Sequence, residues 1–169
     1  MAKKYLPGVL GLLILLFLDQ WTKHLASVFL KGKPNFVLIK NVFELEYLEN
    51  RGAAFGILQN QRWLLLGITI IIFSVLCVVY YRIPAKKRYI LLHGVLVLIG
   101  AGAIGNMLDR FLAGYVVDFL YVSCINFPIF NIADCYVVAG VAAAALLIMF
   151  RYSEEELESI WGKKKKVEE

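Results

Sequence analysis

Long apolar runs separated by polar segments form the main pattern of this sequence. The apolar runs cover residues 5–22, 63–81, 89–108 and 132–150. A helix needs roughly 20 apolar residues to cross the hydrocarbon core of a bilayer, and each run comes close to this length. The pattern predicts an α-helical integral membrane protein with four transmembrane helices, organised as a single polytopic membrane domain over residues 1–169.

The polar segments 24–62 and 109–131 are predicted loops. Within the first, the stretch NVFELEYLEN at 41–50 alternates apolar and acidic residues, which is typical of a half-buried strand. We therefore expect a small β-sheet on the membrane surface. The stretch RGAAFG at 51–56 is rich in small residues and predicts a turn. The stretch IGAGAIGN at 99–106 predicts close helix packing, because small residues let helix backbones approach.

The basic residues indicate an orientation. The net charge is +5, and Lys and Arg gather in the first four residues, in RIPAKKR at 82–88 and in the tail at 163–166. Positive charge marks the cytoplasmic side of a membrane protein, so both termini are predicted to be cytoplasmic and both long loops extracytoplasmic. This clustering at the ends of apolar runs favours membrane orientation over nucleic-acid binding. The start also fits a cleaved signal peptide, but the polar DQWTK at 19–23 and three further runs favour a retained helix.

Motifs for nucleophilic or zinc chemistry do not stand out. Cys77, Cys124 and Cys135 have no metal-ligand spacing, and a bond between the last two is left open. The chain has no HExxH motif, no serine in a nucleophile turn and no Cys–His pair. His93 lies within the third run, where packing is the simpler role. We expect no metal and no cofactor.

Asp118 and Asp134 carry the sharpest chemical hypothesis. A carboxylate at membrane depth is costly and needs a partner, a water-filled cavity or a function. Two carboxylates that converge in a poorly solvated site can share one proton, which is the chemistry of aspartic proteases.

Other polar groups gather at the same predicted depth. Asn106, Asp109 and Arg110 share one face of the third helix because their spacing is three and four residues. Asn131 and Asp134 are three apart at the start of the fourth helix.

Each group also has a structural interpretation. Asn131 could simply cap the fourth helix, and Asp134 would be stabilised by the dipole of that helix. Asp118 could be a solvated loop residue, and Asp19 could mark the end of the first helix. Asp109 and Arg110 could form an ion pair at the membrane interface.

Two other functions fit the same residues. Clustered carboxylates with an Arg suit a metal-dependent enzyme acting on a lipid phosphate. A small transporter is the other alternative, although transporters place such residues near the middle of their spans.

Five stretches in order resemble the bacterial lipoprotein signal peptidases (signal peptidase II). They are LDQWTK at 18–23, ENRGAAFG at 49–56, GNMLDR at 105–110, VVDF at 116–119 and FNIAD at 130–134. The resemblance covers nearly the whole chain. It implies a membrane-embedded aspartyl endopeptidase of the bacterial cytoplasmic (inner) membrane, with its active site facing the extracytoplasmic side. Such an enzyme removes the signal peptide of a diacylglyceryl-modified prolipoprotein just before the lipidated Cys.

The resemblance also implies residue roles. Asp118 and Asp134 correspond to the catalytic pair. The residues implied in substrate binding are Asn50, Gly52, Asn106, Arg110 and Asn131, and those implied in structural support are Asp19, Lys23 and Asp109. Glu49 and Arg51 depart from the family pattern by adding charge beside Asn50. We expect a monomer whose partners are the prolipoprotein and membrane lipids.

Overall fold

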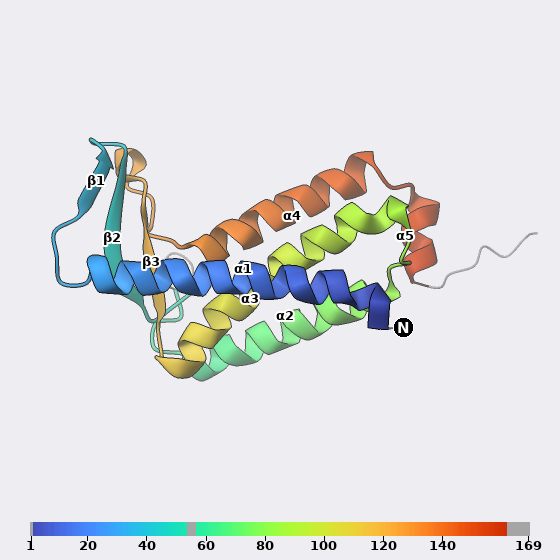
Figure 1. The fold of residues 1–169 in the computed structure, drawn as a ribbon, viewed down its shortest axis with the longest axis horizontal. Coiled ribbons are helices and arrows are strands. Elements are labelled where there is room, and N and C mark those ends of the chain that lie inside the picture. Colours follow the sequence, from blue (N-terminus) through green and yellow to red (C-terminus); the bar gives the residue numbers. More distant parts are fainter. Residues whose placement is uncertain (1, 54–56, 162–169) are drawn as a thin grey trace, which may run out of the picture.

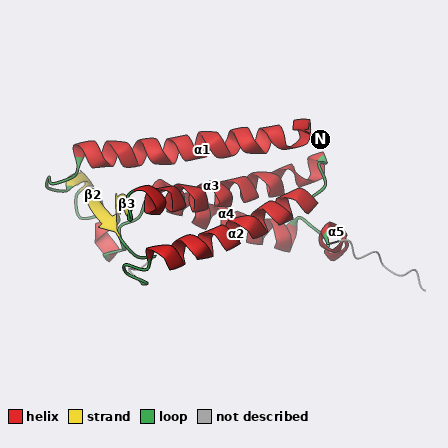
Figure 2. Ribbon diagram, turned by 90° about the horizontal axis from the view of Figure 1, so that it is seen from below, coloured by secondary structure: helices red, strands yellow, loops and turns green. Residues whose placement is uncertain are grey.

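Four long helices form the body of the protein in the computed structural model, which describes residues 2–53 and 57–161 (Figure 1). They are α1 (Ala2–Phe29), α2 (Arg62–Arg82), α3 (Ile90–Leu112) and α4 (Ile132–Phe150). All four are long and apolar enough to cross a membrane. Helix α3 packs against each of the other three, and Figure 2 shows α1 running alongside it. The predicted fold class, a four-helix membrane protein with a small sheet, is confirmed.

Glycines allow α3 and α4 to approach closely. A Cβ atom on Gly102 would collide with the carbonyl oxygen of Ala133, and one on Gly140 would lie 2.5 Å from a side-chain carbon of Ile99. The predicted close packing along 99–106 is therefore present. It brings the first turn of α4 against the C-terminal half of α3.

A three-stranded antiparallel sheet lies at one end of the bundle (Figure 1). Its order is β1 (Phe36–Ile39), β2 (Phe43–Asn50) and β3 (Val116–Tyr121). The strand predicted within 41–50 is confirmed as β2, although both of its faces are partly exposed. Strand β3 occupies part of the segment expected as loop, and it pairs Leu48 with Asp118 and Asn50 with Val116. A single bridge from Leu120 to Phe130 ties β3 to the chain just before α4.

Two helices extend further than the sequence indicated. Helix α1 continues to Phe29, so residues 24–29 are not loop, and α3 continues to Leu112, so Asp109 and Arg110 lie in its last turns. The charges do not end these helices because they find partners within the bundle. Asp19 pairs with Lys23, and Lys23 also pairs with Asp109. Of the turn predicted at 51–56, residues 54–56 lie outside the described residues.

The opposite end of the bundle is closed by the short helix α5 (Glu154–Ile160), in a segment beyond the last apolar run where no helix was expected. Ile160 belongs to a small buried cluster with Ile83, Tyr89, Leu92 and Tyr152. Arg88 donates to both carboxylate oxygens of Glu156, at 2.9 and 3.0 Å. The apolar cluster and this ion pair dock α5, which explains the difference. The basic run at 163–166 lies outside the described residues.

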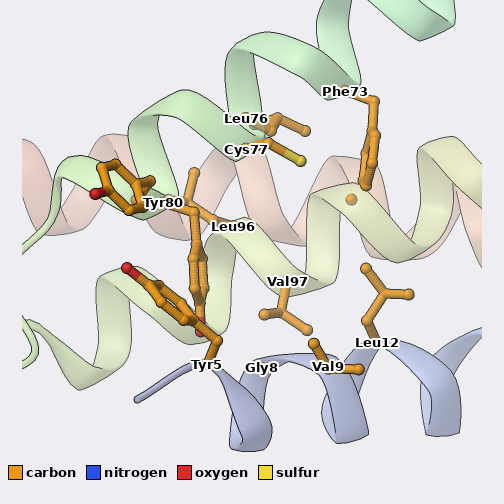
Figure 3. Close-up of a pocket in the computed structure, with 12 residues that line it drawn as sticks. Tyr5, Gly8, Val9, Leu12, Phe73, Leu76, Cys77, Tyr80, Leu96 and Val97 are labelled. Atoms are coloured by element: carbon orange, nitrogen blue, oxygen red, sulfur yellow. The ribbon is translucent and has the colours of Figure 1, made fainter. Parts of the chain in front are cut away.

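Two short 3-10 helices, η2 (Lys87–Tyr89) and η3 (Ser123–Ile125), complete the secondary structure of the described residues. An apolar cavity of about 350 Å³ separates α1 from α2 on one side of α3 (Figure 3). Tyr5 and Tyr80 lie at one end of it, and Leu12 and Phe73 at the other. None of the predicted site residues lines this cavity.

Candidate active site

Asn131 links the two central carboxylates. It is the N-cap of α4, where its Oδ1 accepts a hydrogen bond from the backbone N–H of Asp134 at 3.0 Å. In return, the Asp134 Oδ2 accepts from the backbone N–H of Asn131 at 3.1 Å, completing a capping box. The side-chain Nδ2 of Asn131 remains available and donates to Asp118 Oδ1 at 2.6 Å. One buried side chain thus both caps the helix and holds the other carboxylate.

Two more asparagines complete the set of donors. Asn50, at the end of β2, donates from Nδ2 to Asp118 Oδ2 at 2.9 Å. Asn106, on α3, donates from Nδ2 to Asp134 Oδ1 at 2.7 Å. Each of the four carboxylate oxygens therefore accepts one hydrogen bond from an amide N–H. Because a carboxylate oxygen has two lone pairs, each oxygen keeps one position for a proton or a water molecule as far as contacts with the described residues are concerned.

Burial makes the Asp118 carboxyl a weaker acid than usual. Its side chain is 1% exposed. Desolvation raises the pKa of Asp118 to about 6, and the nearby charge of Asp134 pushes it the same way, whereas hydrogen bonds from Asn50 and Asn131 act in the opposite direction. Asp118 can therefore hold a proton close to neutral pH. The interpretation of Asp118 as a solvated loop residue is wrong.

A second polar cluster lies beside the first. The Lys23 ammonium is 2.8 Å from Asp19 Oδ2 and 2.8 Å from Asp109 Oδ2. It also donates to Asn106 Oδ1 at 2.9 Å. Asp19 reaches α4 as well, because its Oδ1 accepts from the backbone N–H of Ala133 at 3.0 Å. These side chains join α1, α3 and α4, and both Asp19 and Lys23 are almost fully buried.

Gly52 and Arg110, which the resemblance places with the substrate-binding residues, hold the chain that leaves β2. Arg110 Nη2 donates to the Gly52 carbonyl at 2.8 Å, and the Gly52 N–H donates to Asn50 Oδ1 at 2.9 Å. A Cβ atom on Gly52 would lie 2.5 Å from the Ile57 carbonyl oxygen, so the close approach requires glycine. The hydrogen bond from the Gly52 N–H engages Asn50 Oδ1, so the Asn50 Nδ2 faces Asp118.

Gln20 is a site residue that the sequence analysis missed. Its Nε2 donates to Asp109 Oδ1 at 2.8 Å and to Asp19 Oδ2 at 3.2 Å. The sequence did contain an indication of this role, because Gln20 is a polar amide next to Asp19 in an otherwise apolar run.

The two charges that depart from the family pattern pair with each other on the surface. Glu49 accepts from Lys31 at 2.7 Å and lies 3.4 Å from Arg51. The hydrogen bond from Lys31 lowers the pKa of Glu49. Glu49 and Asn50 are consecutive strand residues, so their side chains point to opposite faces of the sheet, and the extra charge faces away from Asp118.

The cysteines, all three of which the structure describes, are free thiols. Within residues 2–53 and 57–161, no three His, Cys, Asp or Glu side chains are grouped so as to hold a metal ion. His93 packs edge-to-face against Tyr80, with ring centroids 4.5 Å apart.

Comparison with known proteins gives consistent matches over most of the chain. The family model described as signal peptidase (SPase) II matches residues 11–150. The lipoprotein signal peptidase of Halothermothrix orenii is 41% identical over 145 residues, which are 86% of this chain and 94% of that protein. The lipoprotein signal peptidase of Streptococcus thermophilus is 39% identical over 155 residues, or 92% and 97% of the two chains.

Solved structures agree with the sequence matches. One bacterial membrane enzyme superimposes with a TM-score of 0.73 at 30% identity, covering 96% of this chain and 94% of its own. A second superimposes with a TM-score of 0.72 at 32% identity, covering 86% and 94%.

The dual contact of Asn131 predicts two effects of Asn131→Ala. Loss of the cap should lower the free energy of unfolding by about 1 kcal/mol. Loss of the hydrogen bond to Asp118 should raise the pKa of Asp118 further, because that bond favours the ionised carboxylate. Thermal unfolding and a carboxyl ¹³C NMR titration in detergent micelles would measure both.

Ser153→Ala is the matched control for Asn131→Ala. Ser153 and Glu156 form the same kind of capping box on α5, at the other end of the protein. We expect a small loss of stability and an unchanged Asp118 pKa. An Asp118 pKa that moves equally in both variants, or in neither, would contradict the assigned role of Asn131.

Proposed function

Since the chain belongs to the signal peptidase II family, we propose that it is a membrane-embedded aspartyl endopeptidase with Asp118 and Asp134 as its catalytic pair. Its proposed substrate is a diacylglyceryl-modified prolipoprotein, cut just before the lipidated Cys. The family is one of proteases, and the matched relatives are lipoprotein signal peptidases. The observation that carries the mechanism is the pair of carboxylates joined through Asn131, one of them fully buried with a raised pKa.

The pair would work with one proton shared between its members. The raised pKa of Asp118 favours Asp118 as the protonated member and Asp134 as the base. Asp134 takes a proton from water as the water oxygen attacks the scissile carbonyl, while Asp118 gives its proton to the carbonyl oxygen. Asp134 then protonates the leaving amine as the C–N bond breaks. The new carboxyl group returns a proton to Asp118, so the pair ends as it began.

The surrounding amides would keep the pair in this geometry. Asn50, Asn106 and Asn131 each present an N–H to a carboxylate oxygen, so none of them can accept the catalytic proton there. Fixed donors lower the cost of reorganisation during the reaction. We therefore assign these asparagines to positioning the pair, and Gly52 with Arg110 to positioning Asn50.

The orientation is also a proposal. The site and the sheet lie at one end of the bundle, whereas the N-terminus and α5 lie at the other (Figure 1). The basic loop with Arg82, Lys86 and Lys87 joins α2 to α3 at that second end. The tendency of positive charge to stay inside favours a cytoplasmic location for this end and an extracytoplasmic active site. We also propose a monomer embedded among membrane lipids.

Thiol labelling in whole cells tests the orientation. Cys124 is exposed in η3, at the same end as the sheet. With Cys77 and Cys135 changed to serine, Cys124 should react with a membrane-impermeant maleimide added outside. A thiol introduced by Lys86→Cys, with all three native cysteines changed to serine, should react only after permeabilisation. The opposite pattern would reverse the topology.

Removal of either proposed catalytic carboxylate should abolish cleavage. We expect Asp118→Asn and Asp134→Asn each to lower kcat by at least about a hundredfold, because general acid–base catalysis contributes roughly this much or more. The assay is cleavage of a diacylglyceryl-modified prolipoprotein by the purified protein in excess chelator. Far-ultraviolet circular dichroism and thermal unfolding would verify that the variants remain folded.

Glu44→Gln provides the control for charge removal on the same sheet. Glu44 lies on β2, and its carboxylate meets only the exposed Asn35 amide among the side-chain hydrogen bonds of the described residues. This variant should cleave at the normal rate. Normal turnover by either aspartate variant would rule out the proposed pair.

The rate should also depend on pH in a bell-shaped manner. Because burial raises the pKa of Asp118 to about 6, the pair loses its shared proton as pH rises through this region, and kcat should then fall by up to about tenfold per pH unit. In acid the pair gains a second proton, and kcat should fall again. Initial rates from pH 3 to 9 would measure the profile, and a constant rate across this range would contradict a shared proton.

A further inference from the structure

We propose that Lys23 is a positioning residue for the reaction, which sets the orientation of the Asn106 amide and through it the position of Asp134. This inference rests on the proposed function, because it concerns the same catalytic pair. It assigns Lys23 a specific role beyond general support of the fold.

The two ends of the Asn106 side chain face partners of opposite kind. Its Oδ1 lies 2.9 Å from the Lys23 ammonium, and its Nδ2 lies 2.7 Å from Asp134 Oδ1. An ammonium group can only donate hydrogen bonds, and an ionised carboxylate can only accept them. A reversed amide would place N–H groups against the ammonium and a carbonyl oxygen against the carboxylate. Lys23 therefore selects the one orientation that supplies a donor to Asp134.

Asn131 supports the same orientation but more weakly. Its Nδ2 donates to Asn106 Oδ1 at 3.2 Å while also donating to Asp118 at 2.6 Å. The shorter contact goes to Asp118, so the Asn131 amide is principally engaged there. Without Lys23, the longer hydrogen bond from Asn131 would be the only one left to Asn106 Oδ1 from the described part of the chain.

Because Lys23 is buried, a single substitution cannot distinguish its positioning role from its contribution to stability. Lys23 is 3% exposed and pairs with both Asp19 and Asp109. Its removal alone would leave the buried carboxylate of Asp19 and the partly buried carboxylate of Asp109 without their cation, which destabilises a protein whatever else the residue does. A test must therefore separate neutralisation of the carboxylates from orientation of the amide.

The double variant Lys23→Met with Asp19→Asn makes this separation. It removes one positive and one negative charge together, and the new amide oxygen can still accept from the Ala133 N–H. We expect its thermal stability to recover most of what Lys23→Met alone loses. We expect kcat for prolipoprotein cleavage to remain about 10- to 100-fold low, because a small misplacement of a catalytic group has an effect of this size. KM should change less than about twofold, since Lys23 would not touch the substrate.

The pH profile gives a readout that a purely structural role would not move. Among the described residues, the charged and titratable groups around the pair are Asp19 and Lys23 on α1, Asp109 and Arg110 on α3, the Cys135 thiol on α4, and the two carboxylates themselves. The positive charge of Lys23 lowers the pKa of Asp118, so its removal should shift the alkaline limb of the rate profile to higher pH. Lys31→Met with Glu49→Gln is the matched control, because it removes a surface pair and should alter neither kcat nor the profile.

A double-mutant cycle on Asn106 completes the test. If Lys23 acts through Asn106, adding Lys23→Met and Asp19→Asn to Asn106→Ala should lower kcat no further. Lys23→Met with Asp109→Asn offers the same neutralisation from α3 if the first pair of changes does not fold. The role of Lys23 would be overturned by a folded double variant whose kcat is normal and whose pH–rate profile is unshifted. It would also be overturned if the decreases in kcat caused by the double variant and by Asn106→Ala multiply. Such results would leave the catalytic pair intact, whereas normal turnover by Asp118→Asn would overturn the proposed function itself.

Discussion

The first turn of α4 begins among buried residues, and the polar architecture depends on giving its backbone N–H groups acceptors. Asn131 and Ala133 are fully buried. Unsatisfied backbone groups at membrane depth cost several kcal/mol each, so each N–H needs an acceptor from the protein. The Ala133 N–H finds Asp19 on α1, and the Asp134 N–H finds the Asn131 side chain. This requirement brings the carboxylate of Asp19 from α1 to the turn that carries Asp134, a member of the proposed catalytic pair.

Burying Asp19 creates a second requirement, which Lys23 meets. An isolated buried carboxylate is unfavourable, and the ammonium four residues later on the same helix compensates it. The same ammonium contacts Asp109 and Asn106 on α3, so the compensation extends across two helices. Asn106 joins this charged cluster to the proposed catalytic pair because its amide has both an acceptor and a donor end. The cluster and the pair are therefore one continuous network, in which a change on α1 can reach Asp134.

The sequence predicts the parts of this arrangement that depend on local pattern. Four apolar runs predict four helices, and the three- and four-residue spacings correctly place Asn106 with Asp109 and Asn131 with Asp134. Strand β3 was missed because VVDFLY is apolar apart from Asp118 and shows no alternation. The end of α1 was missed because Asp19 and Lys23 look like a polar boundary when their partners on α3 and α4 are unknown. Helix α5 depends on a cluster formed by residues far apart in sequence, which no local pattern reveals.

The structural and functional interpretations of Asn131 prove to be compatible, and the reason lies in the chemistry of its side chain. Ser, Thr, Asp and Asn all make good helix caps because each offers an oxygen to the first N–H groups. An Asp at this position could cap α4, but once ionised it has no donor for Asp118. Ser or Thr has only one O–H proton on a shorter side chain that is already accepting from the backbone. Asn alone among these residues presents an acceptor to the helix and a separate donor to the carboxylate, as the contacts at 3.0 and 2.6 Å show. A residue that satisfies the fold with one atom can therefore serve the site with another, so the discovery of a structural role does not count against a functional one.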